Sequence, residues 1–124
     1  SDPLSISSNI KFIKGNIFNS KAQTIVNTIN CVGVMGKGIA LEAKKLFPLL
    51  PKKLGYDLAH HGNKLYLYDE LRLFTFPTKY NYYEPSNIDL ICCSAIELMN
   101  MMDNMCIKNA VLPRPGGGYG GLKW

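Results

Sequence analysis

The apolar positions of this chain fall into short β-branched or aromatic runs and into longer runs with a helical period. The short runs predict five strands, at residues 9–18, 24–29, 64–68, 71–76 and 106–112, the first of them ending at Gly15 and Asn16. The helical spacing predicts one helix over residues 37–47, ended by Pro48, and a second that follows Ser86 as its N-cap. Strands that alternate with helices are typical of an α/β fold with a mixed, largely parallel sheet.

Other parts of the pattern are interrupted by proline and glycine. Residues 48–63 contain two prolines and two glycines, and they predict no more than one helical turn, around residues 56–60. Asp69 and Glu70 are expected to form a tight hairpin between two strands, and Pro77 is expected to end the second of them. The last helix is expected to bury one stripe at helical spacing, namely Ile88, Ile91, Cys92, Ala95, Leu98, Met99 and Met102.

Glycines follow two of the predicted strands. Gly33, Gly36 and Gly38 lie between the strand that ends at Asn30 and the next helix, and residues 116–121 form a second glycine loop. Glycine lets the backbone approach a ligand closely and a helix N-terminus favours anions, so such loops can bind phosphate. The spacing matches neither a Walker A loop nor the Gly-x-Gly-x-x-Gly fingerprint of dinucleotide-binding proteins. The alternative is that the first loop is only a tight turn.

Several candidate groups come directly after predicted strands. These are Asn30, the first glycine loop, Lys79 and the second glycine loop. Ligands of open α/β sheets bind outside the carboxyl ends of the strands. We therefore expect one site at that edge, where the two loops could hold a diphosphate from opposite sides.

The composition agrees with one globular domain and suggests an anionic partner. The chain has 124 residues, of which 47% are hydrophobic, and a formal net charge of +5, which suits nucleic acid or a phosphate-rich ligand. No apolar run reaches the roughly 20 residues of a membrane span, and we identify no signal peptide. Four cysteines without a Cys-x-x-Cys pair argue against zinc and against a disulfide framework. We therefore expect no metal or cofactor, and a cytoplasmic protein with reduced thiols.

Four motifs together resemble the macrodomain family: VNTIN at 26–30, GVMGKGIA at 33–40, FPTK at 76–79 and GGGYGGLKW at 116–124. They are most similar to its DNA ADP-ribosyl glycohydrolase branch, the antitoxin half of a DNA-ADP-ribosylating toxin–antitoxin pair. Terminal ADP-ribose protein glycohydrolase is a close relative. The resemblance covers nearly the whole chain from Ile10 onward. It implies a three-layer α/β/α macrodomain over residues 1–124, with residues 1–8 as a tag or a disordered lead-in.

The resemblance also implies a role for each site residue. Asn16 and Ile17 would contact the adenine of ADP-ribose, and Asn30 would contact the distal ribose. The first diphosphate loop would consist of Val34, Met35, Gly36, Lys37, Gly38 and Ile39. The second would consist of Gly117, Gly118, Tyr119, Gly120, Gly121 and Leu122. Thr78 would contact ADP-ribose beside Lys79, which matches the catalytic lysine of the branch.

Three departures from the family pattern affect these expectations. The adenine contact is more usually Asp, so Asn16 makes a weaker bond to the adenine amine. The protein-acting relative has a catalytic Asp in its second loop, where this chain has Gly120, and this favours the DNA-acting branch. The sequence stops at Trp124, where the family continues into at least one more helix, so a C-terminal helix is expected to be missing.

The expected activity is release of ADP-ribose from a modified DNA base, thymidine by resemblance. Lys79 would attack or stabilise the anomeric carbon of the distal ribose. An amine is nucleophilic only when uncharged, so we expect the site to lower the pKa of Lys79 from about 10.4. The sequence does not decide which acid protonates the leaving base, and Glu42 and Glu84 are the candidates. A protein mono-ADP-ribosyl hydrolase and a reader that binds ADP-ribose without cleaving it are the alternatives, and a cognate toxin is a possible partner.

Aromatic residues follow the lysine directly. Tyr80, Tyr82 and Tyr83 suit single-stranded DNA, whose bases stack on aromatic rings. The alternative is that they shield the hydrophobic edge of the sheet. Basic residues that could lie near them are Lys64, Arg72 and Arg114.

Overall fold

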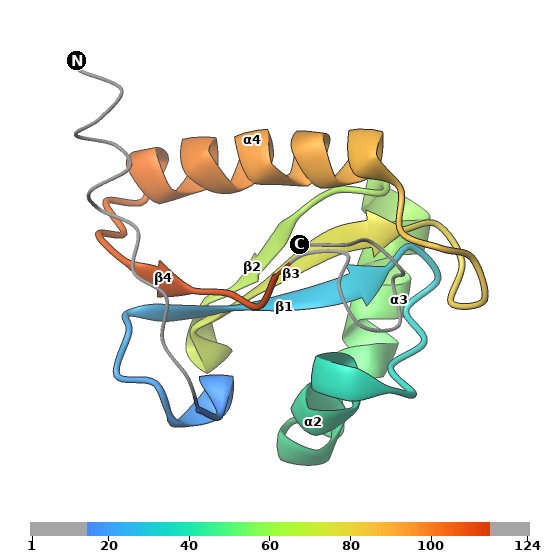
Figure 1. Ribbon diagram of the computed structural model, residues 1–124, viewed down its shortest axis with the longest axis horizontal. Coiled ribbons are helices and arrows are strands. Elements are labelled where there is room, and N and C mark those ends of the chain that lie inside the picture. Colours follow the sequence, from blue (N-terminus) through green and yellow to red (C-terminus); the bar gives the residue numbers. More distant parts are fainter. Residues whose placement is uncertain (1–14, 115–124) are drawn as a thin grey trace.

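The computed structural model describes residues 15–114, which form a layered α/β domain (Figure 1). The elements follow in the order η1 (Ile17–Asn19), β1 (Thr24–Asn30), α2 (Gly38–Leu46), α3 (Leu50–His61), β2 (Tyr66–Tyr68), η2 (Asp69–Leu71), β3 (Leu73–Lys79), α4 (Ile88–Asn104) and β4 (Ala110–Val111). The sheet has the order β2-β3-β1-β4, in which only β2 is antiparallel to its neighbour. This confirms the predicted α/β class and the largely parallel sheet.

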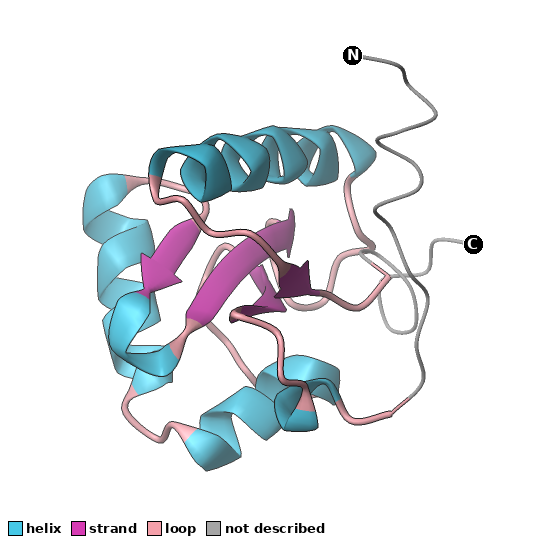
Figure 2. Cartoon of the chain, turned by 90° about the vertical axis from the view of Figure 1, so that its left-hand side faces the viewer, coloured by secondary structure: helices cyan, strands magenta, loops and turns pink. Residues whose placement is uncertain are grey.

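Helices cover both faces of the sheet, as Figures 1 and 2 show with α4 on one side and α2 on the other. Alternate residues of β1 serve the two layers because side chains of a strand point to opposite faces. Ile25 and Ile29 join the core with the buried leucines of α3, whereas Val26 joins the core with Ile91 and Leu98 of α4. The two apolar clusters hold β1 and β3 in the buried centre of the domain.

The segment at residues 48–63 was predicted wrongly, because it forms the regular helix α3 and not a single turn. Pro51 lies in the first turn, where a backbone N–H would have no partner within the helix anyway. Gly62 follows the last turn with a φ of 102°, which a glycine adopts readily. The proline and glycine that suggested an irregular segment therefore mark the two ends of a helix. Its buried face consists of Leu50, Leu54 and Leu58.

Strand β3 extends beyond the predicted end, through Pro77 to Lys79. Its partner β2 pairs with Leu73–Thr75, and beyond that point β3 has a neighbour on one side only among residues 15–114. Proline is tolerated in a sheet where one side of the strand is unpaired. The register with β1 also shifts between Ile29 and Asn30. The prediction that Pro77 ends the strand was wrong, because a proline disrupts a strand only where a neighbouring strand needs its missing N–H group.

Helix α4 begins one residue later than predicted, and its predicted buried stripe is confirmed for Ile91, Ala95, Leu98 and Met102, which join the core. Its N-cap is Asn87, whose side chain accepts a hydrogen bond from the backbone N–H of Leu90 at 3.0 Å. The buried residues are Leu90, Ile91, Ser94 and Leu98. From the predicted stripe, Ile88, Cys92 and Met99 are exposed. Ser94 was not predicted to be buried, because it is polar. Its hydroxyl can be buried because it donates to the carbonyl oxygen of Pro77 at 2.7 Å.

The outer strands are shorter than predicted. Of the strand predicted at residues 64–68, only Tyr66–Tyr68 form β2. Of the strand predicted at residues 106–112, only Ala110–Val111 form β4. Cys106 has a φ of 56°, a left-handed conformation that no strand contains. The first strand was predicted to end at Gly15 and Asn16, and the 3-10 helix η1 follows at Ile17–Asn19. The rest of that strand, the lead-in at residues 1–8 and the second glycine loop lie outside the described residues.

Within residues 15–114, no helix combines the length and the apolar character that crossing a membrane requires.

Candidate functional site

The carboxyl ends of β1 and β3 lie side by side, and they bring two candidate residues together. Asn30 is the register partner of Lys79 across the sheet. The N–H of Cys31 donates to the carbonyl oxygens of Lys79 and Tyr80, at 3.0 and 3.1 Å. Lys79 is half-buried at this edge. The predicted convergence at one edge of the sheet is therefore confirmed for the loop after β1 and for Lys79.

Asn30 holds the first glycine loop through its side-chain amide. Its oxygen accepts from the N–H groups of Val32 and Val34, both at 3.1 Å, and its nitrogen donates to the carbonyl of Val34 at 2.7 Å. The residue is 7% exposed. The side chain of Asn30 thus positions the loop, and the expected contact with a distal ribose stays a prediction.

The loop exposes its backbone at the start of α2. Val34, Gly36 and Lys37 are exposed, whereas Met35 is buried in the core and anchors the loop from below. In the described part of the chain, the side chain of the N-cap residue Lys37 makes no capping hydrogen bond, and the first turn of α2 contains no acidic residue. The first N–H groups of a helix lack partners within it and attract anions. The loop and the helix start therefore suit a phosphate group.

Helix α3 supports the loop from behind. Gly33 has a φ of 80°, and a Cβ atom built on it would lie 3.1 Å from the Cα of Gly55 in α3. Only glycine combines this backbone conformation with so close an approach. This contact was not predicted, because the hydrophobic pattern did not indicate α3.

The proposed adenine end lies on the same face of the sheet as α2. Ile17 and Phe18 of η1 pack against the core cluster that Ala40 of α2 also contacts. Figure 1 shows η1 beneath the first half of β1. The side chain of Asn16 caps η1 by accepting from the N–H of Phe18 at 2.9 Å. Ile17 thus packs on the same side of the sheet as α2, and the contact of Asn16 and Ile17 with adenine stays a prediction.

The other predicted site residues lie inside the sheet, in the first turn of α2, or outside the described range. Thr78 is 5% exposed, and its hydroxyl donates to the carbonyl of Ile29 at 3.4 Å. The observed role of Thr78 is therefore to link β3 to β1. Ile39, in the first turn of α2, is half-buried. The second-loop residues Gly117–Leu122 lie outside the described residues.

The two candidate acids occupy different surroundings. Glu42 lies 4.0 Å from Lys45 on the exposed side of α2. The carboxylate of Glu84 accepts from the side-chain amide of Asn81 at 2.5 Å, in the turn that follows Lys79. Glu84 is therefore the acid that lies on the same connection as the lysine.

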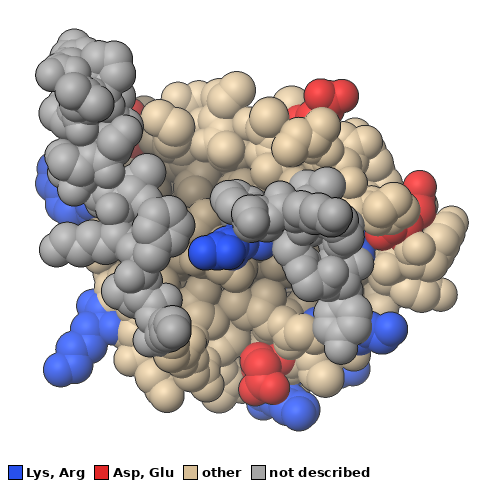
Figure 3. Space-filling view, in the orientation of Figure 1, with Lys and Arg blue, Asp and Glu red and all other residues tan. Residues whose placement is uncertain are grey.

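The expectation that Arg72 lies near the tyrosines is wrong. Arg72 precedes β3, and its guanidinium donates to the carbonyls of Ala22 and Gln23, so it lies at the opposite end of the strand from Lys79. Lys64 lies 5.9 Å from the ring of Tyr66 instead. On the face that Figure 3 shows, the basic side chains of the described residues lie in several separate places. The positive charge of residues 15–114 therefore does not form one patch on that face.

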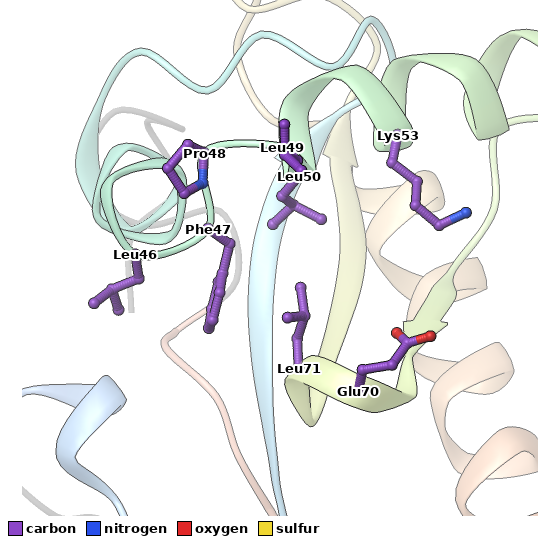
Figure 4. Close-up of a pocket in the computed structure, with 8 residues that line it drawn as sticks. All are labelled: Leu46, Phe47, Pro48, Leu49, Leu50, Lys53, Glu70 and Leu71. Carbon is purple, nitrogen blue, oxygen red and sulfur yellow. The ribbon is translucent and has the colours of Figure 1, made fainter.

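A cavity of about 380 Å³ lies away from the candidate site (Figure 4). Leucines from α2, α3 and η2 line it, and Lys53 and Glu70 stand at one end. Leu71 of η2 precedes β3, so this cavity belongs to the amino end of that strand and not to the edge with Lys79. The cavity is therefore separate from the candidate site.

Cys31, at the base of the first loop, is expected to resist alkylation. Burial raises the pKa of its thiol to about 11, so at pH 8 about one molecule in a thousand carries the thiolate. Cys92, Cys93 and Cys106 are exposed. After brief treatment with iodoacetamide at pH 8, peptide mass spectrometry should find these three modified and Cys31 unmodified. Equal labelling of all four would contradict the burial of this strand end.

Comparisons with known proteins agree with this geometry, although no protein-family model matches the chain. The DNA ADP-ribosyl glycohydrolases of Thermus aquaticus and Mycobacterium tuberculosis are 32% and 33% identical to it, over 93% of the chain in both cases. A DNA ADP-ribosyl transferase–DNA ADP-ribosyl glycohydrolase fusion protein of Thermosipho africanus is 29% identical over 98% of the chain. The chain spans about a third of the length of each: 34%, 35% and 37%.

Solved structures from the same three organisms share the fold. The DarG macrodomain of Mycobacterium tuberculosis superposes with a TM-score of 0.85 at 30% identity, covering 91% of this chain and 80% of that one. The macrodomain of Thermus aquaticus DarG gives 0.84 at 31% identity, covering 92% and 82%. The DarTG of Thermosipho africanus in complex with ADP-ribose gives 0.78 at 28% identity, covering 89% and 34%.

The layered sheet, with a glycine loop that leads into α2 beside a strand-end lysine, defines a macrodomain. The two DarG macrodomains match it at 30% identity or more over at least four fifths of their own length. The chain therefore belongs to the DarG macrodomain family, as the four sequence motifs indicated.

Proposed function

We propose that this macrodomain binds ADP-ribose and hydrolyses it from a modified DNA base, thymidine by the resemblance. The observation that supports the proposal is the pairing of Asn30 with Lys79, since it brings the first glycine loop and the half-buried residue Lys79 to one edge of the sheet. Relatives named DNA ADP-ribosyl glycohydrolase, and a neighbour solved with ADP-ribose, support the choice of ligand and reaction.

In the proposed reaction, the diphosphate binds against the exposed loop at the start of α2, and Lys79 acts on the anomeric carbon of the distal ribose. The bond between this carbon and the base nitrogen breaks, and the base takes the bonding electrons and a proton. Water supplies the hydroxyl group of the released ADP-ribose. Preorganised backbone N–H groups hold the substrate without reorganisation, which is why a loop fixed by Asn30 suits the task.

The wild-type chain should release ADP-ribose from a single-stranded oligonucleotide modified on thymidine, as chromatography of the products would measure. A protein ADP-ribosylated on glutamate serves as the competing substrate. Faster release from the protein would assign the domain to protein mono-ADP-ribosyl hydrolases. Binding of free ADP-ribose without release from either substrate would make it a reader.

We also propose that a DNA ADP-ribosyl transferase is the functional partner, with this domain as the antitoxin. The fusion of both activities in the Thermosipho africanus relative supports this pairing. A cytoplasmic location belongs to the same proposal, because DNA is the substrate and all four cysteines are free thiols.

A further inference from the structure

The apolar cavity bounded by α2, α3 and η2 has leucines at its rim that the domain does not bury (Figure 4). Leu49, between the two helices, is 81% exposed, and Leu46, at the end of α2, is 54% exposed. Inside, Leu50 of the core and Leu71 of η2 point toward each other across the cavity. The rim and the interior therefore form one apolar surface. A concave apolar surface that stays exposed marks an interaction site.

Lysines accompany this surface on both sides of the leucines. Two lie in the last turn of α2 and two in the first turn of α3, and all four are exposed: Lys44, Lys45, Lys52 and Lys53. The chain has no acidic residue between the first and the last of them. Of the carboxylates on the neighbouring elements, Glu42 lies 4.0 Å from Lys45, and Glu70 stands with Lys53 at one end of the cavity. The carboxylate of Asp57 accepts from the hydroxyl of Tyr68 at 2.8 Å. The connection between α2 and α3 is thus a basic rim around an apolar centre.

Two of these lysines lie where a helix favours the opposite charge. The N–H groups at a helix N-terminus carry partial positive charge, so the first turn of a helix is stabilised by carboxylates. The first turn of α3 contains Lys52 and Lys53 and no acidic residue, and its N-cap Leu49 makes no capping hydrogen bond. A carboxylate supplied by a partner would be attracted by the helix end and by the lysines together. This end of the cavity therefore matches an acidic partner.

We propose that the cavity is a docking site for a polypeptide segment that inserts one leucine- or phenylalanine-sized side chain and carries carboxylates on both sides of it. The volume of about 380 Å³ falls within the range of about 300–1,000 Å³ that is typical of ligand pockets. A polypeptide can fill the cavity and also cover Leu46 and Leu49, which a small molecule inside it would leave exposed. An apolar centre with a charged rim is typical of protein–protein contacts. The inference does not depend on the proposed reaction, because the cavity lies at the amino end of β3, away from Lys79.

The test begins with a library of random 12-residue peptides displayed on phage, from which the immobilised whole chain selects binders. The recovered peptides should share an apolar side chain with aspartate or glutamate on both sides of it. A fluorescent synthetic peptide of the recovered sequence should bind the wild-type chain in an anisotropy assay, and more weakly as salt is raised. Leu49→Asp should weaken this binding about 10- to 100-fold, since it replaces an apolar contact by a repelled charge. Lys53→Glu should weaken it about 3- to 10-fold.

Ile96→Asp is the matched control. Ile96 is 60% exposed on α4, which covers the opposite face of the sheet from α2, so the same change there should keep the parent affinity. Circular dichroism should show all three variants folded, because each replaced side chain is exposed.

Recovered peptides without acidic flanks, or equal binding of the peptide to Leu49→Asp and wild type, would overturn the docking site. Binding of the chain to phosphatidylglycerol vesicles in place of peptides would also overturn it, since the leucines and lysines would then contact a membrane. A self-associated chain that Leu49→Asp turns into a monomer, as sedimentation would measure, would assign the surface to a second copy instead. Failure of the glycohydrolase reaction would leave each of these results unchanged.

Discussion

Replacing Lys79 by alanine is expected to slow release of ADP-ribose from a modified oligonucleotide by about 10²- to 10⁴-fold, the range typical of a lost catalytic side chain. Lys79 ends β3 and is half-buried, and its register partner Asn30 holds the loop that is proposed to bind the diphosphate. The amine is thus the side chain that the fold brings to the proposed position of the distal ribose. Single-turnover rates, measured by chromatography of released ADP-ribose, check the prediction.

Binding separates the chemical role of Lys79 from a structural one. Lys79→Ala should still bind free ADP-ribose with an affinity within a few-fold of the parent, as calorimetry would measure. Lys52→Ala, which removes an exposed lysine from α3, should leave both rate and affinity unchanged. Release by Lys79→Ala at the parent rate would contradict the mechanism.

Lys79→Arg distinguishes the two chemical roles that the sequence leaves open. A guanidinium keeps its positive charge but cannot act as a neutral nucleophile, because it stays protonated throughout the pH range in which proteins are folded. An inactive arginine variant would therefore indicate that Lys79 attacks the anomeric carbon as a free amine. Substantial activity in this variant would indicate that the lysine acts through its charge.

The half of the site around β1 could be predicted because its signals are local. A β-branched run from Thr24 to Ile29 predicts a buried strand, and the glycines and helical spacing after it predict a loop that leads into α2. Lys79 could be placed near this loop only by the rule that parallel strands end at one edge of the sheet. The observed parallel pairing of β1 with β3 confirms that rule here.

The contacts that support the site could not be predicted, because they join residues distant in the sequence. Pro51 and Gly62 interrupt the hydrophobic pattern and concealed α3, although they only mark its ends. Ser94 is absent from the predicted buried stripe of α4, although it is buried and its hydroxyl donates to the carbonyl of Pro77 inside the domain. Arg72 is near the lysine in sequence, but a seven-residue strand separates the two in space. Hydrophobic periodicity carries no information on such partners.

The contact between the first loop and α3 leads to a paired prediction at Gly33 and Gly55. Gly33→Ala is expected to lower the free energy of unfolding by about 2–3 kcal/mol, since a side chain at a positive φ costs about 1–2 kcal/mol and the close backbone contact adds to it. The new Cβ would lie 3.1 Å from the Cα of Gly55, a backbone atom that cannot rotate away. Denaturant unfolding followed by circular dichroism measures the change.

Gly55→Ala should have the opposite effect, although it alters the other partner of the same contact. A Cβ on Gly55 meets nothing within 4 Å, so it points away from Gly33. Alanine in place of glycine inside a helix stabilises it by up to about 1 kcal/mol. ADP-ribose affinity should fall in Gly33→Ala, whose loop must move, and stay at the parent value in Gly55→Ala. If the two variants were equally stable, α3 would not support the loop as the structure describes, and the geometry proposed for the diphosphate would lose its basis.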